Sequence, residues 1–254
     1  MVKKIFVKKF LPICICALFV PEIHAFNDIS HKHVTKTSFE AFTKSEPASK
    51  NRDHKEFKYV SDFLKNDETD YKELFVDYSI QPDIDENQGV YKYHFYNPVT
   101  KSNFMNEEES ALTKFKEHFN KAVSSYKKGE KVKSYQELGR AVHFMEDMNT
   151  PVHTAYEIPL DSVKKLPLHM NFEKICDSIC GECGFDVIPD TLCYYQINSL
   201  DTIANAAATL SADNFYYLEN QKMDKKVIAK NSIKNAQEKV SGVLYKFFKE
   251  VSEA

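Results

Sequence analysis

Apolar residues recur at helical spacing along most of the chain, which predicts an almost entirely helical protein. Helices are expected at 28–42, 55–63, 107–128, 133–148, 200–220 and 227–251. In the last of these the apolar positions form one broad stripe: Ile228, Ile233, Ala236, Val240, Val243, Leu244, Phe247 and Val251. A stripe of this width packs against a core. The pattern therefore predicts an all-α, single-domain helical bundle.

Two segments lack the helical period and are expected to be loops. Residues 80–93 contain Pro82, Gly89 and three acidic residues, and residues 157–167 contain two further prolines. Pro and Gly interrupt helices and favour turns.

The first 25 residues have the composition of a secretory signal peptide. Four lysines lie among the first nine residues, and the apolar run at 10–20 is too short to cross a bilayer. Ala25 supplies a small residue for cleavage before Phe26. We expect a signal peptide over 1–25, export from the cytoplasm and a folded domain over 26–254.

Removal of this segment takes away four lysines and Glu22, so the formal net charge changes from −3 to −6. A chain of this charge has no broad basic surface for a polynucleotide. The remaining 229 or so residues suffice for one domain with a single core. The six glycines form no glycine-rich phosphate loop.

Two short segments carry the pattern of a metal site. His143 and Asp147 are four residues apart, as are His169 and Glu173, so each pair projects from one face of a helix. His153 follows Pro151, where the first helix is expected to end. Imidazole and carboxylate without thiolate is the ligand mix of catalytic zinc.

These residues also carry a family resemblance. The segment Leu138-Gly-Arg-Ala-Val-His143-Phe-Met-Glu-Asp147-Met-Asn-Thr-Pro-Val-His153 resembles the signature of the bacterial zinc-dependent phospholipases C. Val76-Asp77-Tyr78, the segment His94-Phe-Tyr-Asn-Pro98 and the pair His169 and Glu173 resemble the family's other ligand segments. The resemblance extends from residue 26 to residue 254. It implies a helical bundle with three zinc ions at the bottom of a cleft, and we expect no C-terminal lipid-binding domain.

The resemblance assigns ligands to each of the three ions. The first ion's ligands are Asp77, His94, His143 and Asp147. The second ion's ligands are His153, His169 and Glu173. The third ion shares Asp147 and uses His31 with the free amine and carbonyl of Phe26.

Two of these assignments have an open point. His33 is a rival to His31, although the Ser30-His31 pair fits the family's pattern better. The family usually has Trp where this chain has Phe26, which leaves the backbone ligands intact and the cleavage site less certain.

The resemblance implies a phosphodiester hydrolase that acts on phospholipid at a membrane surface. Asp77 is expected to be a ligand, the general base, or both. The products would be diacylglycerol and a phosphorylated head group such as phosphocholine. A monomer without a stable protein partner is expected. The chief alternative is a zinc-dependent single-strand nuclease, since those nucleases are distant relatives, and a second is a metal-binding protein without activity.

Two tyrosines are candidates for substrate binding. Tyr78 and Tyr91 match positions where the family places aromatic rings around choline, and a quaternary ammonium binds aromatic faces. The alternative is that both are ordinary tyrosines in a chain that has fourteen.

Four cysteines follow Glu173 at close spacing: Cys176, Cys180, Cys183 and Cys193. In an exported protein this spacing favours two disulfides over a small structural zinc site. Three pairings are open, and the sequence does not choose among them.

Overall fold

The computed structural model describes residues 28–44, 60, 69–85, 91–155, 165–181 and 199–252. Within these ranges the regular elements are helices, apart from one isolated antiparallel bridge between Asn97 and Ser102. The all-α prediction is therefore confirmed for this part of the chain. The expected signal peptide, Phe26, Cys183, Cys193 and all of the predicted helix at 55–63 except Val60 lie outside the described residues.

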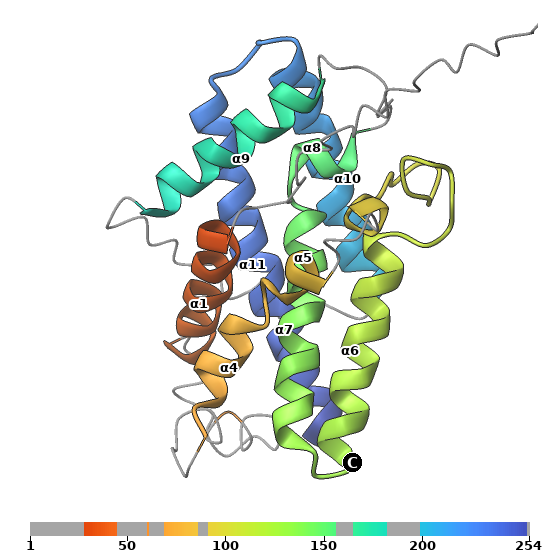
Figure 1. Cartoon of the computed structure of the whole chain (residues 1–254), viewed down its shortest axis with the longest axis vertical. Coiled ribbons are helices and arrows are strands. Elements are labelled where there is room, and N and C mark those ends of the chain that lie inside the picture. The colour runs from red at the N-terminus through yellow and green to blue at the C-terminus, as the bar shows by residue number, and fades with distance from the viewer. Residues whose placement is uncertain are drawn as a thin grey trace, which may run out of the picture.

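A hairpin of α6 (Ala111–Lys127) and α7 (Lys131–Asp147) forms one side of the bundle, with α7 toward its middle (Figure 1). The turn between them places Gly129 at φ +81°, a conformation that glycine adopts without strain. Apolar side chains at helical spacing, such as Phe115 and Phe119 on α6 and Leu138 and Val142 on α7, are buried. In the last two turns of α7, residues 141–147 are all buried. This end of α7 is therefore surrounded by other elements on every side.

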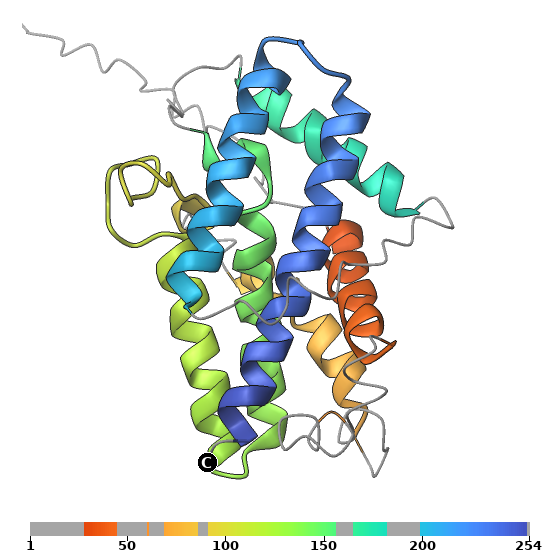
Figure 2. The same ribbon diagram turned by 180° about the vertical axis from the view of Figure 1, so that it is seen from behind.

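A second pair of long helices, α10 (Leu200–Glu219) and α11 (Lys225–Ser252), covers the back of the hairpin (Figure 2). The eight apolar residues of the predicted stripe on α11 are all buried. They pack against α1, α6, α7, α9 and α10. The prediction that this stripe forms core is confirmed.

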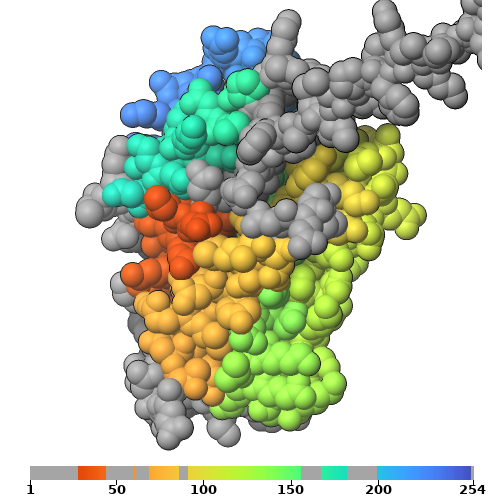
Figure 3. Space-filling model, viewed as in Figure 1, coloured from red at the N-terminus to blue at the C-terminus, as the bar shows by residue number. Residues whose placement is uncertain are grey.

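The opposite side of α7 is covered by α1 (Asp28–Lys44), α4 (Tyr71–Asp77) and α5 (Gln81–Asp85), and α9 (Lys165–Gly181) packs against α1, α8 and α11. The surface view in Figure 3 shows α1, α9 and the segment at 71–85 meeting on one face. The short helices η2 (Tyr91–His94) and α8 (Pro151–Thr154) complete the fold. Among the described residues, no helix combines the length and apolar character that a membrane span requires.

The close packing of α4 on α7 depends on Gly139. A Cβ atom at this position would lie 2.5 Å from the carbonyl oxygen of Phe75 and 2.8 Å from Cβ of Tyr78. Both contacts are too short for non-bonded heavy atoms, so only glycine fits here.

The differences from the predicted elements are mostly in short helices. The predicted loop at 80–93 contains α5 and η2, and α9 begins at Lys165, inside the predicted loop at 157–167. The seven residues of α4 are too few to show a helical period. Their start is marked instead by Asp70, whose carboxylate accepts a hydrogen bond from the Glu73 amide at 3.1 Å.

Candidate metal centre

Eight buried side chains from α1, α5, η2, α7, α8 and α9 converge beside the end of α7. They are His31, Asp83, His94, His143, Asp147, His153, His169 and Glu173. Their ligand atoms form three adjacent groups, and within each group these atoms lie within 4.8 Å of one another. The order of the chain explains the convergence: α7 ends at Asp147, and Thr150, extended before Pro151, starts α8 in a new direction.

The first group consists of Asp83, His94 and His143. Oδ1 of Asp83 lies 3.6 Å from Nδ1 of His94 and 3.6 Å from Nε2 of His143. Asp147 lies beside them, since its Oδ2 is 2.8 Å from Nδ1 of His94 and 3.4 Å from Nε2 of His143. Two carboxylates and two imidazoles therefore face one point.

The second group consists of His153, His169 and Glu173. The Nε2 atoms of the two histidines are 3.1 Å apart. Oε1 of Glu173 lies 2.5 Å from Nε2 of His169 and 3.5 Å from Nε2 of His153. The ring of Phe95 stacks on His153 at 4.6 Å between centroids, which holds that ring from one side.

The third group consists of His31, His143 and Asp147. Nε2 of His31 is 4.0 Å from Oδ1 of Asp147, and the rings of His31 and His143 stack at 4.1 Å between centroids. Asp147 thus reaches the first group through Oδ2 and the third through Oδ1. A carboxylate in this position can bridge two metal ions.

Hydrogen bonds at Nδ1 orient two of the rings. Nδ1 of His143 donates to the carbonyl of Ser79 at 2.7 Å, and Nδ1 of His153 donates to the carbonyl of His94 at 3.0 Å. With the proton at Nδ1, the lone pair of each ring is at Nε2, which points into the cluster. Such contacts fix the tautomer of a metal-binding histidine.

The electrostatics of the cluster are those of a site that accepts cations. Burial, followed by the neighbouring imidazoles of His31 and His94, holds the pKa of His143 well below its usual range. Burial and His169 lower the pKa of His153 in the same way. Burial, followed by the charge of Asp147, raises the pKa of Glu173 well above its usual range. His143 and His153 are therefore neutral and able to bind metal, and the crowded carboxylates favour a positive ion among them.

The donor set and its spacing fit zinc. Tetrahedral zinc with nitrogen and oxygen ligands at about 2.0–2.1 Å separates neighbouring ligand atoms by about 3.3 Å. Distances between ligand atoms of the cluster run from 2.5 to 4.0 Å, and those of 3.1, 3.4, 3.5 and 3.6 Å lie near that value. Neutral imidazole and carboxylate without thiolate is the chemistry of a catalytic zinc site.

A family model described as zinc dependent phospholipase C matches residues 53–232. The chain belongs to this family. Phospholipase C from Clostridium haemolyticum is 25% identical over 193 residues, which cover 68% of this chain and 48% of that protein. Phospholipase C from Clostridium perfringens is 27% identical over 203 residues, covering 69% and 49%. The chain thus spans about half the length of these relatives.

Solved structures agree on the fold. The alpha toxin from Clostridium absonum superimposes with a TM-score of 0.72 at 21% identity, over 87% of this chain and 63% of that one. The alpha-toxin of an avian strain of Clostridium perfringens gives a TM-score of 0.67 at 19% identity, over 92% and 66%. The zinc-dependent phospholipase C fold is therefore present here.

The structure brings together seven of the nine ligands that the sequence predicted: His31, His94, His143, Asp147, His153, His169 and Glu173. It includes His31 and not His33 in the three groups. That these residues bind zinc stays a prediction. Phe26, the ninth candidate, lies outside the described residues.

The prediction for Asp77 needs correction. Its carboxylate is 60% exposed, and Oδ1 accepts a hydrogen bond from Nζ of Lys32 at 2.7 Å. The cause is the helix α4, which ends at Asp77 and directs this side chain outward, away from the cluster. Asp83, six residues later on α5, is the carboxylate that enters the first group. Sequence reasoning missed it because it assigned 80–93 to a loop, although Pro82 and the acids on both sides of Ile84 were visible.

The two candidate choline-binding tyrosines have other contacts. The phenol oxygen of Tyr78 accepts a hydrogen bond from Gln136 at 2.8 Å, and the guanidinium of Arg140 lies 5.5 Å from its ring centroid. The ring of Tyr91 stacks on Phe104 at 5.9 Å. An aromatic face already beside a guanidinium is less available to a second cation. The choline prediction for this pair stays untested.

The cysteines show no disulfide in the described residues. Cys176 and Cys180 are free, buried thiols on α9, one turn apart. Burial raises the pKa of Cys180 to about 12. The prediction of two disulfides among the four cysteines is therefore wrong for this structure, because Cys176 and Cys180 take no part in one. Cys183 and Cys193 lie outside the described residues.

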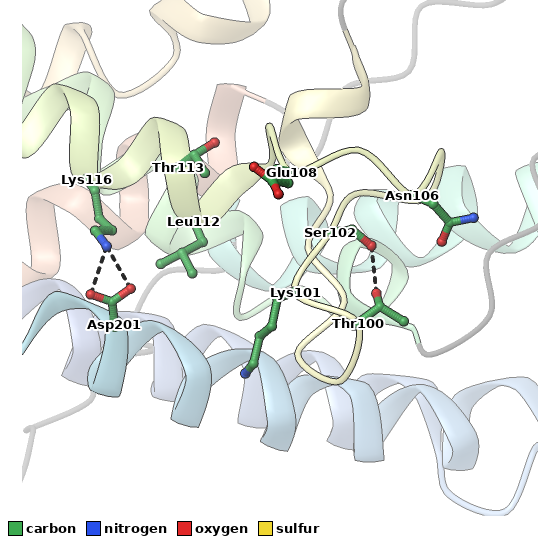
Figure 4. A pocket seen from close by; sticks show the side chains of 9 residues that line it. All are labelled: Thr100, Lys101, Ser102, Asn106, Glu108, Leu112, Thr113, Lys116 and Asp201. Carbon is green, nitrogen blue, oxygen red and sulfur yellow. Dashed lines mark hydrogen bonds and ion pairs between the residues drawn. The ribbon is translucent and has the colours of Figure 1, made fainter.

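An open pocket of about 670 Å³ lies elsewhere, between the segment at 100–113 and the start of α10 (Figure 4). Nζ of Lys116 donates to both carboxylate oxygens of Asp201 at 2.8 Å on its wall. The eight side chains of the three groups are absent from its lining. Lys116 and Asp201 neutralise each other, Lys101 and Glu108 also line the pocket, and none of the three ligand groups opens into it.

Proposed function

We propose that the protein is a secreted zinc phospholipase C that hydrolyses the glycerol-side phosphodiester bond of phosphatidylcholine-like lipids. Three adjacent groups of buried nitrogen and oxygen ligands, in a chain of this family, carry the proposal. Three ions are expected, one at each group. His143 belongs to two of the groups, and because only its Nε2 faces the cluster, it would bind one of the two ions. The products are diacylglycerol and a phosphorylated head group.

Zinc in such a site neutralises the phosphodiester and lowers the pKa of a coordinated water from about 16 to near 7. In the reaction, a water oxygen bonds to phosphorus and the bond from phosphorus to the glycerol oxygen breaks. One water proton leaves during attack, and the glycerol oxygen gains a proton to become the hydroxyl of diacylglycerol. Charge develops on the phosphoryl oxygens, so fixed positive charge stabilises the transition state more than the ground state.

Asp83 takes over the catalytic role that the sequence assigned to Asp77. Its two oxygens lie 3.6 Å from His94, 3.6 Å from His143 and 3.8 Å from His31, so it faces the centre of the cluster. In this position it serves as a ligand, as the base that takes the proton of the attacking water, or as both. The Asp83 side chain is buried, so it is available to the cluster and not to the bulk solvent.

Export from the cytoplasm is part of the proposal. It is supported by the basic and apolar segments within the first 25 residues. Amino-terminal sequencing of protein recovered from a culture medium or periplasmic fraction tests it, and a chain that begins at Phe26 is expected.

One set of assays tests the function. Purified protein is incubated with phosphatidylcholine, with sphingomyelin and with single-stranded DNA under the same conditions. We expect hydrolysis of phosphatidylcholine, loss of that activity with a chelator, and recovery with added zinc. Cleavage of the DNA instead of the lipid would identify a nuclease, and no hydrolysis of any substrate would support a binding protein.

Metal analysis tests the number of ions independently of substrate. Wild-type protein is expected to contain three zinc ions per chain. Asp147→Asn is expected to lose at least two, because Asp147 contributes to two groups. Fewer than two ions in the wild type would contradict the trinuclear centre.

Head-group preference is tested at the two tyrosines. If Tyr91 binds choline, Tyr91→Leu should raise KM for phosphatidylcholine about 2- to 30-fold, the value of a contact of about 0.5–2 kcal/mol. The KM for a lipid without a quaternary ammonium should be unchanged. Tyr78→Leu also loses the contact with Arg140. If Tyr78 is a packing residue, this variant should change the KM values for the two lipids by the same factor.

A further inference from the structure

Glu146 is a completely buried carboxylate that belongs to none of the three ligand groups. It precedes Asp147 on α7 and follows His143 by three residues, so it lies on the side of the helix that faces the cluster. A buried carboxylate requires hydrogen bonds or a positive partner to offset its lost hydration. Its partners therefore indicate what it does.

Both oxygens of Glu146 are bonded to one helix, α1. Oε2 accepts a hydrogen bond from Nδ1 of His31 at 2.5 Å, and Oε1 accepts one from Oγ1 of Thr35 at 2.7 Å. His31 and Thr35 are four residues apart and lie on one face of α1. The carboxylate is thus held at two points, and its contact with His31 is the shorter one.

The bond to Glu146 determines which nitrogen of His31 faces the cluster. A proton at Nδ1 leaves the lone pair at Nε2, which lies 3.8 Å from Oδ2 of Asp83 and 4.0 Å from Oδ1 of Asp147. These are the distances of ligand atoms on either side of a metal position. A flipped His31 ring would not direct this lone pair toward Asp83 and Asp147.

The partner of His31 also differs in kind from those of two other rings. Nδ1 of His143 and Nδ1 of His153 each donate to a backbone carbonyl. Nδ1 of His31 donates to a carboxylate, which is a stronger acceptor and makes the opposite nitrogen more basic.

We propose that Glu146 is a positioning residue of the metal centre, which fixes the ring and tautomer of His31 and strengthens Nε2 as a ligand for one ion. The inference rests on the zinc centre of the proposed function and is independent of the substrate. Loss of a carboxylate that holds a metal-binding histidine by a hydrogen bond lowers metal affinity about 10- to 100-fold. The effect should be confined to the ion that His31 binds.

Stepwise removal of zinc by a competing chelator tests this proposal in the full chain. Glu146→Gln keeps the size of the side chain and an acceptor oxygen but removes the negative charge. We expect one ion of three to be released at a free zinc concentration about 10- to 100-fold higher than in the wild type. The other two ions should be released at the same free zinc concentrations as in the wild type.

The chain offers a matched control on the same helix. Oε2 of Glu137 accepts a hydrogen bond from Nδ1 of His118 at 2.6 Å, and neither residue belongs to a ligand group. Glu137→Gln removes the same kind of carboxylate–imidazole contact. We expect it to leave all three zinc affinities unchanged.

Two further measurements distinguish two roles for Glu146. In one it orients the His31 ring, and in the other it only stabilises the packing of α1 on α7. Nitrogen NMR of the zinc-loaded protein should show the His31 proton at Nδ1 in the wild type, and a weaker hydrogen bond there in Glu146→Gln. Thr35→Val removes only the second contact of the carboxylate and should weaken the same ion to a smaller extent. This variant keeps the test valid if Glu146→Gln does not fold.

Equal zinc affinities in wild type, Glu146→Gln and Thr35→Val would overturn the inference. So would equal weakening of all three ions, because that result indicates a structural clamp. A wild type that binds no zinc would instead overturn the proposed function along with it.

Discussion

Oδ1 of Asp83 lies 3.6 Å from Nδ1 of His94, in a group that His143 completes. Asp83→Asn removes the charge of this carboxylate without changing its size. We expect loss of at least one zinc ion and a fall in turnover of about 100-fold or more. Zinc analysis and lipid hydrolysis measure the two effects.

Asp77→Asn is the matched comparison. The Asp77 carboxylate is exposed and paired with Lys32, and such surface ion pairs contribute little. We expect unchanged zinc content and activity within about twofold. The reverse result, with Asp77→Asn inactive and Asp83→Asn active, would restore Asp77 as the ligand.

The predicted ligand at Phe26 is tested by extending the chain. A free α-amine binds metal, whereas the amide formed by one added residue does not. Protein with a single residue before Phe26 should fold, bind one zinc fewer and lose most of its activity. Proteolytic trimming to Phe26 should restore both, and equal zinc content before and after trimming would exclude the amine as a ligand.

Gly139→Ala is expected to destabilise the protein. The new methyl group would contact the Phe75 carbonyl at 2.5 Å, so α4 must move away from α7. Overpacking of this kind costs about 1–3 kcal/mol, more than the helix propensity of Ala restores. Gly181→Ala is the control, because no atom lies within 4 Å of its Cβ position. Urea unfolding should show a lower free energy of unfolding for Gly139→Ala than for the wild type, and no loss for Gly181→Ala.

Thiol titration tests the state of Cys176 and Cys180. With a pKa of about 12, only about one Cys180 thiol in ten thousand is ionised at pH 8. In a Cys183→Ser, Cys193→Ser variant that begins at Phe26, and so lacks Cys14 and Cys16, the folded protein should react very slowly with a thiol reagent. After denaturation without reductant, two thiols should titrate. For the unaltered chain, a mass four units below that of the reduced form would instead establish the two predicted disulfides.

The pair of Glu137 and His118 should make stability depend on pH. Burial would raise the pKa of Glu137, but the hydrogen bond and charge of His118, helped by Lys121 and Arg140, hold it below its usual value. A carboxyl group with a lowered pKa contributes stability above its unfolded pKa of about 4.5, and this contribution is lost as the pH falls through the folded pKa. Glu137→Gln should therefore be less stable than wild type at pH 7. Denaturant unfolding should show this difference shrinking below about pH 4.5.

Helical spacing predicted four of the eight cluster residues because it is local information, whereas His31 and His94 were assigned by the family resemblance. His143 with Asp147, and His169 with Glu173, are each one turn apart, so their common direction follows from the helix alone. Asp77 and Asp83 could not be told apart in this way. Which of them points inward depends on where α4 ends and how α5 packs on α7, and neither short helix has a visible period.

The role of Glu146 was hidden for a different reason. Its neighbours in sequence already formed a metal pattern, and its partners, His31 and Thr35, lie more than a hundred residues earlier. Only the packing of α1 on α7 brings them to the same carboxylate. Contacts between residues so far apart along the chain leave no periodic pattern in the sequence.

The eight side chains of the cluster extend along the chain from His31 on α1 to Glu173 on α9. Ions held between them would act as cross-links among helices that are otherwise joined by side-chain packing and a few hydrogen bonds. A ligand that binds the folded state alone, at a hundred times its Kd, stabilises that state by about 2.7 kcal/mol per site. The supply of zinc around the protein would then govern its resistance to proteases, so that enzyme released into a zinc-poor environment would be degraded as well as inactive.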